Sequence, residues 1–179
     1  MQTPPPPPVP ALDTPRLTLR AHTLADFAEC AALWGDPLVT RHIGGRPSTP
    51  EEVWTRLLRY AGMWTLLGFG YWVVRERETE RLVGEVGLAD FRREITPLID
   101  APEAGWVLAP WAHGRGLATE AVRAALAWAD AHLAAPRTVC LISPENAASI
   151  HVAGKCGYRE FARTTYKGED TIIFERPRP

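Results

Sequence analysis

The chain has 179 residues, of which 20 are Lys or Arg and 21 are Asp or Glu, so its formal net charge is −1. This length suits one domain with a single core, and 46% hydrophobic and 23% charged residues are typical of globular domains. Near-neutrality removes the simplest argument for a nucleic-acid or anionic-membrane partner, and no apolar run approaches the ~20 residues of a membrane span. We therefore expect no nucleic-acid partner and no membrane partner.

The first eleven residues are rich in proline and lack the basic and apolar regions of a secretory signal. We expect residues 1–11 to form a tail that is disordered or in polyproline II conformation, and residues 12–176 to form one domain. A ligand for a proline-reading domain is the alternative for this tail. Three cysteines at unpatterned spacings indicate neither a disulfide framework nor a zinc site, so we expect a cytoplasmic protein without a metal.

The amino-terminal half predicts one strand and two helices. Arg16–Arg20 alternates apolar and polar residues, as a half-buried strand does. Thr23-Leu-Ala-Asp26 is a capping-box variant that opens a helix, and Gly35-Asp36-Pro37 ends it. A second helix begins at Thr49, where a proline and two carboxylates follow the cap, and we expect it to end by Gly62 or shortly after.

The carboxyl-terminal half alternates strands and helices. The remaining predicted strands are 71–74, 82–88, 104–109, 139–142, 158–165 and 171–174, and the helices are 117–133 and 146–156. The order is β-α-α-β-β-β-α-β-α-β-β, with about seven strands and about four helices. This order predicts an α/β (α+β) fold with a mixed sheet covered on both faces.

A glycine-bearing loop joins the strand 104–109 to the following helix. Gly114 and Gly116 allow the backbone amides to converge on one point, and the helix start adds positive potential. That combination describes an oxyanion or phosphate cradle, and Arg115 adds a charge of the same sign. Thr119 stands where a Rossmann fingerprint would require the third glycine, and no Walker A sequence is present. A turn whose glycines serve packing alone is the alternative.

A second segment runs from Asn146, which is positioned as a helix cap, through Ser149 one turn later to Gly157-Tyr158. By itself this is an ordinary Asn cap with a glycine stop. Together with the loop, however, it resembles the GNAT acetyl-CoA-dependent N-acetyltransferases. Their Arg/Gln-x-x-Gly-x-Gly/Ala pyrophosphate loop is similar to His113-Gly-Arg-Gly116-Leu-Ala118.

The resemblance is closer to the RimJ/RimL-type (ribosomal-protein-alanine N-acetyltransferase-like) branch and covers about residues 12–175. It is carried by five segments in the family's order: 12–20, 34–43, 82–87, 103–108 and 146–158. It implies the GNAT fold, in which a central, mixed, mostly antiparallel twisted sheet is flanked by helices. It also implies acetyl-CoA as co-substrate and a direct attack of a primary amine on the thioester.

The resemblance assigns roles to residues of this chain. The residues expected to bind acetyl-CoA are Val107, Leu108, Ala109, His113, Gly114, Arg115, Gly116, Leu117, Ala118, Thr119 and Asn146. Glu103 is the first candidate for the general base and Glu85 the second, each with a solvated or structural carboxylate as its alternative. Many relatives place a proton-donating tyrosine where this chain has Ala153, so Ser149 becomes the candidate donor to the thiolate.

The expected function is therefore an acetyl-CoA-dependent N-acetyltransferase acting on a protein N-terminal α-amine or a small-molecule amine. We expect its acceptor groove around 34–45, with Trp34, Trp106 and Trp111 near the cleft, and the protein to be a monomer or homodimer. Ala153 and His113, which depart from the family pattern, keep a non-catalytic acyl-CoA-binding module open as the alternative.

Overall fold

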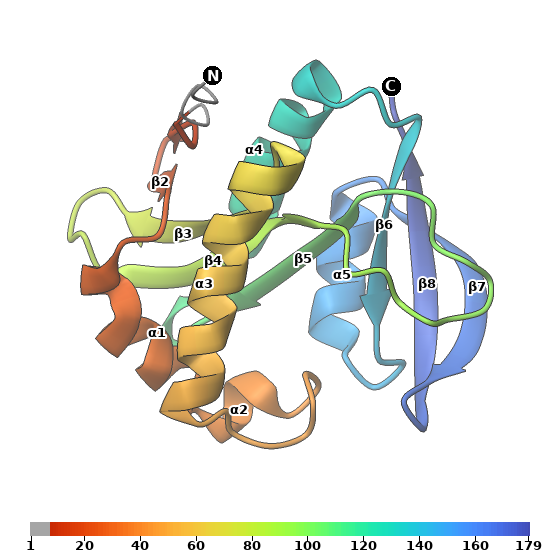
Figure 1. Cartoon of the computed structure of the whole chain (residues 1–179), viewed down its shortest axis with the longest axis horizontal. Coiled ribbons are helices and arrows are strands. Elements are labelled where there is room, and N and C mark those ends of the chain that lie inside the picture. The colour runs from red at the N-terminus through yellow and green to blue at the C-terminus, as the bar shows by residue number, and fades with distance from the viewer. Residues whose placement is uncertain (1–7) are drawn as a thin grey trace, which may run out of the picture.

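Eight strands form one sheet in the order β1-β2-β3-β4-β5-β6-β8-β7 (Figure 1). The structure is a computed structural model that describes residues 8–179, so most of the predicted proline tail lies outside the described residues. The strands are β1 (Leu12–Asp13), β2 (Leu17–Arg20), β3 (Tyr71–Glu76), β4 (Leu82–Ala89), β5 (Glu103–Leu108), β6 (Arg137–Ile142), β7 (Arg159–Tyr166) and β8 (Glu169–Pro177). The helices are α1 (Phe27–Trp34), α2 (Pro37–Thr40), α3 (Pro50–Leu67), α4 (Leu117–His132) and α5 (Ala147–Lys155), with 3₁₀ turns η1 (Leu24–Asp26) and η2 (Pro110–Ala112).

The predicted α/β class and mixed, mostly antiparallel sheet are confirmed, since only β5 and β6 pair in parallel within residues 8–179. The sheet has one strand more than the sequence pattern indicated. The additional strand is the two-residue β1, which a turn closed by the Thr14 N–H and the Leu17 carbonyl at 2.9 Å folds back onto β2. Such a short strand has too few residues to show a period.

The structure also has one more helix than predicted, because a one-turn helix, α2, begins at Pro37 within the segment predicted to end the first helix. The Asp36 side chain accepts a hydrogen bond from the Leu38 N–H at 2.8 Å, and Pro37 occupies the first helical position. Gly35 caps the end of α1, and the adjacent Asp36 caps the start of α2.

The long helix α3 begins as predicted and ends later than predicted. The Thr49 side chain and Glu52 form the expected capping box. The helix does not end near Gly62, because the following residues Met63 and Trp64 are buried and keep it packed on the sheet. It ends at Gly68, whose left-handed φ of 74° suits glycine.

The two faces of the sheet pack against different helices. Successive residues of a strand point to opposite faces, and in β3 Trp72 and Val74 join the core formed with α4, whereas Val73 joins the core formed with α1. The described start of the chain adds to the first core, since Val9 packs against it and the Pro10 carbonyl accepts a hydrogen bond from Trp72 Nε1 at 2.8 Å. Among residues 8–179, no helix is long and apolar enough to cross a membrane.

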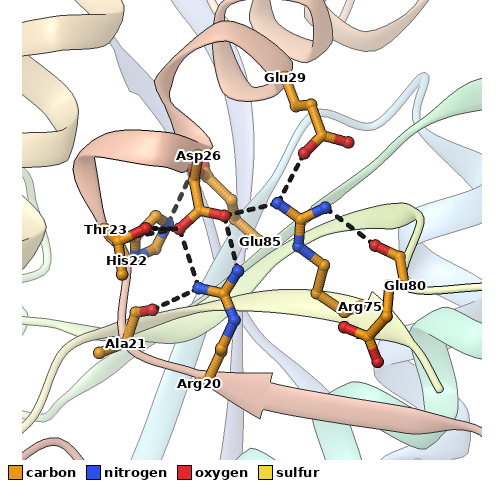
Figure 2. Close-up of polar contacts among 9 residues, drawn as sticks. All are labelled: Arg20, Ala21, His22, Thr23, Asp26, Glu29, Arg75, Glu80 and Glu85. Atoms are coloured by element: carbon orange, nitrogen blue, oxygen red, sulfur yellow. Dashed lines mark hydrogen bonds and ion pairs between the residues drawn. The ribbon is translucent and has the colours of Figure 1, made fainter.

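A buried carboxylate ties the first helical segment to the sheet (Figure 2). Asp26, which is 1% exposed, accepts hydrogen bonds from Arg20 at 2.8 and 2.9 Å, from Arg75 and from the Thr23 backbone N–H. Burial favours the protonated form, but the hydrogen bonds outweigh it and hold the pKa of Asp26 well below its ordinary value. Arg75 also pairs with Glu29 at 2.6 Å, so β2, β3, η1 and α1 meet at this network.

Replacing Asp26 with Asn should lower the free energy of unfolding near neutral pH by about 3–5 kcal/mol, because both guanidinium groups lose a buried partner. The folded-state pKa is depressed, so the carboxylate stabilises the fold above its unfolded-state pKa of about 3.9 and loses this effect as pH falls further. The difference between wild type and Asp26→Asn, measured by urea unfolding, should therefore narrow below about pH 4.

Glu78→Gln is the matched control, because Glu78 is exposed and has no ion pair among residues 8–179. It should change stability by less than about 0.5 kcal/mol. A similarly small change for Asp26→Asn would show that the network does not stabilise the fold.

Candidate functional site

The sheet opens between β5 and β6. These strands pair only at Glu103 and Val139, where the Val139 N–H donates to the Pro102 carbonyl at 3.0 Å, and they diverge beyond that point (Figure 1). A cleft of about 610 Å³ lies at the divergence, and we refer to it as the central cleft. Its lining includes residues of α3, β5, β6, α5 and the β7–β8 hairpin, among them Trp34, Arg56, Arg59, Tyr60, Arg93, Glu103, Trp106, Val107, Asn146, Ser149 and Tyr166.

The central cleft brings together some of the predicted site residues and leaves others outside. Glu103, Val107, Asn146 and Ser149 line it, whereas Glu85 and the loop from His113 to Thr119 do not belong to its lining within the described chain. Two of the three tryptophans expected near the cleft, Trp34 and Trp106, also line it. The third, Trp111, donates its Nε1–H to the Leu82 carbonyl at 3.2 Å, outside the cleft lining.

Glu103 stands at the closed end of the central cleft as half of an ion pair. Arg93 donates from Nε and Nη2 to its two carboxylate oxygens at 2.6 and 2.7 Å, and the carboxylate is 7% exposed. The Arg93 guanidinium in turn lies over Phe91 and Tyr166, 4.6 and 5.0 Å from their ring centres. The candidate base is therefore a charged, oriented carboxylate rather than a solvated strand-edge group.

Glu85 lies beneath the cleft wall, 2% exposed, with each oxygen engaged. His22 Nε2 lies 3.0 Å from one oxygen, and Trp34 Nε1 donates to the other at 2.8 Å. Cys30 lies close by, and burial together with this carboxylate raises the pKa of its thiol. His22, Cys30 and Glu85 could offer ligand atoms within 4.8 Å of one another, but both Glu85 oxygens already accept protein hydrogen bonds. Glu85 therefore meets the cleft through two lining residues: Trp34, which donates to it, and Tyr60, whose ring centre lies 5.3 Å from that of His22.

The start of α5 presents two polar side chains to the cleft. Asn146 caps the helix, as expected, with Oδ1 accepting from the Ser149 N–H at 3.1 Å. This cap fixes the side-chain amide and leaves its Nδ2 donors without an acceptor among residues 8–179. The Ser149 hydroxyl likewise makes no hydrogen bond within the described chain, so both groups are free to meet a ligand in the cleft.

The glycine loop has the backbone geometry of an anion cradle. Gly114 and Gly116 have φ of 71° and 76°, and Gly116 precedes the first residue of α4 without a side-chain cap. A Cβ at Gly114 would meet nothing within 4 Å, so open space rather than packing surrounds this turn. The amides of 117–119, the first turn of the helix, find no acceptor in the described part of the chain, as an anion-binding helix start requires.

The charged side chains of that loop are used within the protein. His113 Nε2 lies 3.0 Å from the Leu108 carbonyl, and Arg115 Nη2 pairs with Glu76 at 2.7 Å. Arg16 donates to the Arg115 carbonyl at 2.9 Å and also pairs with Glu120. The positive potential of the loop therefore comes from its amides, since the Arg115 charge is neutralised by Glu76.

The sequence analysis did not identify Arg56, Arg59, Arg93 or Tyr166 as residues of the cleft. Arg56 and Arg59 lie one turn apart on α3, and Arg93 and Tyr166 come from the β4–β5 connection and the end of β7. The i,i+3 arginine pair beside the apolar stripe of α3 was the one signal that could have indicated them. The others depend on tertiary contacts between segments far apart in the chain.

Comparison with known proteins agrees with this geometry. A family model described as "Acetyltransferase (GNAT) domain" matches residues 16–159. The uncharacterized N-acetyltransferase p20 of Bacillus licheniformis is 26% identical over 150 residues, 83% of this chain and 82% of that protein. The uncharacterized protein YkkB of Bacillus subtilis is 30% identical over 110 residues, and the match spans only 62% of its length and 61% of this chain.

Solved structures share the fold across nearly the whole chain. An acetyltransferase from Agrobacterium tumefaciens superposes with a TM-score of 0.80 at 29% identity, covering 93% of this chain and 94% of its own. Spermidine N-acetyltransferase from Vibrio cholerae, solved in complex with CoA and spermine, superposes at 0.73 with 19% identity, covering 92% and 97%. The chain belongs to the acetyltransferase (GNAT) domain family, whose model covers most of its length.

Proposed function

We propose that the protein is an acetyl-CoA-dependent N-acetyltransferase that transfers the acetyl group to a primary amine by direct attack. The observation that carries the proposal is the opening between β5 and β6, which leaves an unpaired strand edge in a chain whose α4 begins with free amides. Coenzyme A is present in the solved Vibrio cholerae relative, which supports the same co-substrate here. Assignment to the RimJ/RimL-type branch and a cytoplasmic location stay predictions.

The described residues fit acetyl-CoA as a substrate. The β5 edge facing β6 has no strand partner beyond Glu103 within residues 8–179. The Ala109 N–H donates to the Val83 carbonyl on the β4 side, so the alternate residues Trp106 and Leu108, which face the same side as the Pro102 carbonyl, can pair with the amide-bearing pantetheine arm in place of the predicted Val107 and Ala109. The amides of 114–119 would bind the pyrophosphate, and the Asn146 Nδ2 would donate to a pantetheine carbonyl. His113 serves to hold the loop on β5 through the Leu108 carbonyl.

The reaction itself forms a nitrogen–carbon bond and breaks the carbon–sulfur bond of the thioester. The amine must lose a proton and the departing thiolate must gain one. An α-amine, with a pKa of about 7.7–8.0, needs less help from a base than a lysine at about 10.4. Glu103, kept oriented by Arg93, would accept this proton directly or through water, and the unpaired Ser149 hydroxyl would supply the one for sulfur.

Incubation with acetyl-CoA and a panel of primary amines should release free CoA thiol in an amine-dependent manner, with the acetylated amine detected by mass spectrometry. Thiol release that does not depend on the amine would be hydrolysis. Binding of acetyl-CoA without turnover on any amine would contradict the proposal and favour the non-catalytic acyl-CoA-binding module.

Replacing Asn146 with Asp should weaken acetyl-CoA binding by about 1–3 kcal/mol, roughly 5- to 150-fold in Kd, because the side chain loses its donors. Aspartate keeps an oxygen to cap α5, so the melting temperature should hardly change. Asn146→Ala loses the cap as well and should lose about 1 kcal/mol of stability in addition. Isothermal titration calorimetry measures the affinity, and wild-type affinity in Asn146→Asp would remove Asn146 from the binding site.

Replacing Glu103 with Gln should lower turnover near neutral pH by at least about 10²-fold, and the loss should shrink at alkaline pH, where the amine is already deprotonated. Ser149→Ala is the informative companion, since the loss of a proton donor should persist at alkaline pH. Initial rates across pH, with melting temperatures as the check on folding, distinguish the two. An unchanged pH profile in Glu103→Gln would mean that the base lies elsewhere.

A further inference from the structure

Two arginines of α3 face the central cleft without an acidic partner. Arg56 and Arg59 both line it, and both also line an adjoining hollow of about 500 Å³ beside the loop after α2. In the structure from residue 8 onward neither forms an ion pair, and the one hydrogen bond of Arg56 is a long contact of 3.5 Å to Ser48 Oγ. Arg56 is half-buried and Arg59 is exposed, and guanidinium groups without an ion-pair partner are available for a ligand.

Arg56 is held in place by a buried chain of contacts. Its Cζ lies 3.5 Å from the centre of the Trp34 ring, and the Trp34 Nε1–H is fixed by the buried carboxylate of Glu85 at 2.8 Å. Stacking occupies the face of the guanidinium and leaves its N–H groups, which lie in its plane, free to donate. Glu85 thereby acts as a positioning residue for a cationic group on the cleft wall.

The other charges of the cleft complete the argument. Arg93 and Glu103 neutralise each other, whereas the β7–β8 hairpin contributes Lys167, Glu169 and Asp170, with a net charge of −1. The α3 residues that line the central cleft are therefore positive, and the acidic groups of the cleft lie on other elements. In the adjoining hollow α3 also contributes Glu51 and Glu52, and Glu52 is paired with Arg46. A ligand with one anionic and one cationic group matches this arrangement better than a polycation does.

We propose that the amine acceptor also carries an anionic group, a carboxylate or a phosphate, which Arg56 and Arg59 bind. This inference rests on the proposed function and narrows its acceptor class. Guanidinium groups bind both anions through paired N–H donors, so the two anions share one recognition chemistry. Polyamines, such as the spermidine named for the Vibrio cholerae relative, would instead place positive charge against both arginines.

The experiment compares amines in pairs that differ in the anionic group: alanine with alaninamide, alanylalanine with its amide, and phosphoethanolamine with ethanolamine, with spermidine as the polycation. We expect kcat/KM to be at least about tenfold higher for the anionic member of one or more pairs. Carboxylate and phosphate are distinguished by which pair shows the preference. Equal or higher values for spermidine and for the members that lack the anionic group would overturn the inference.

The variants test whether the two arginines cause the preference. The double variant Arg56→Gln with Arg59→Gln should abolish it while leaving the Kd for acetyl-CoA unchanged, and Arg59→Glu should reverse it toward cationic amines. Arg81→Gln is the matched control, because Arg81 also stacks on a tryptophan, 4.1 Å from the Trp111 ring centre, but lies outside the cleft lining. A preference that survives the double variant would overturn the inference.

Failure of this inference differs from failure of the proposed function. If no amine gives amine-dependent thiol release, the proposed acetyltransferase activity itself is contradicted. If turnover does not depend on the anionic group, the acetyltransferase activity is supported and only the proposed roles of Arg56 and Arg59 are contradicted.

Discussion

The single point of pairing between β5 and β6 is the constraint on which the site depends. At Glu103 and Val139 the two halves of the sheet are joined, and beyond it each strand has its other neighbour alone. The break leaves a strand edge and the start of α5 facing a common space. β4 holds β5 over its full length, and the Tyr71 hydroxyl lies so close to Gly105 that no side chain would fit there. The cleft is therefore a consequence of the sheet's own packing.

Three buried carboxylates, Asp26, Glu85 and Glu103, are engaged within the protein, whereas Glu169 and Asp170 of the cleft lining form no ion pair within residues 8–179. Asp26 is held by Arg20 and Arg75, and Glu103 by Arg93. Glu85 is paired differently, with an imidazole and an indole N–H. The Trp34 indole that donates to Glu85 is the ring on which the Arg56 guanidinium stacks. Glu85, which the sequence analysis offers as a candidate base, is therefore better suited to orient the Arg56 guanidinium through Trp34.

The fold could be predicted from local signals where these were strong, such as the capping box at Thr49 and the glycine loop before α4. The signals failed where tertiary packing decided the outcome. Gly62 is a plausible helix end in isolation, but burial of Met63 and Trp64 carries α3 past it. The candidate site divides in the same way. Asn146 could be placed as a helix cap from the sequence, and its role in the site and that of Ser149 came from the family resemblance. The pairing of Arg115 with Glu76 joins the start of α4 to β3 and leaves no trace in either segment alone.

The two substrates of the proposed reaction would meet the protein on different elements. The co-substrate side is built from backbone groups of β5 and α4, which side-chain substitution leaves largely intact. The acceptor side is built from side chains of α3 and the β7–β8 hairpin, supported by Trp34 and Glu85. Acceptor preference can therefore change through residues such as Arg56 and Arg59 while the acetyl-CoA site is preserved. Because of this separation, the fold can be shared with solved structures at 19–29% identity even where the residues of the acceptor wall differ.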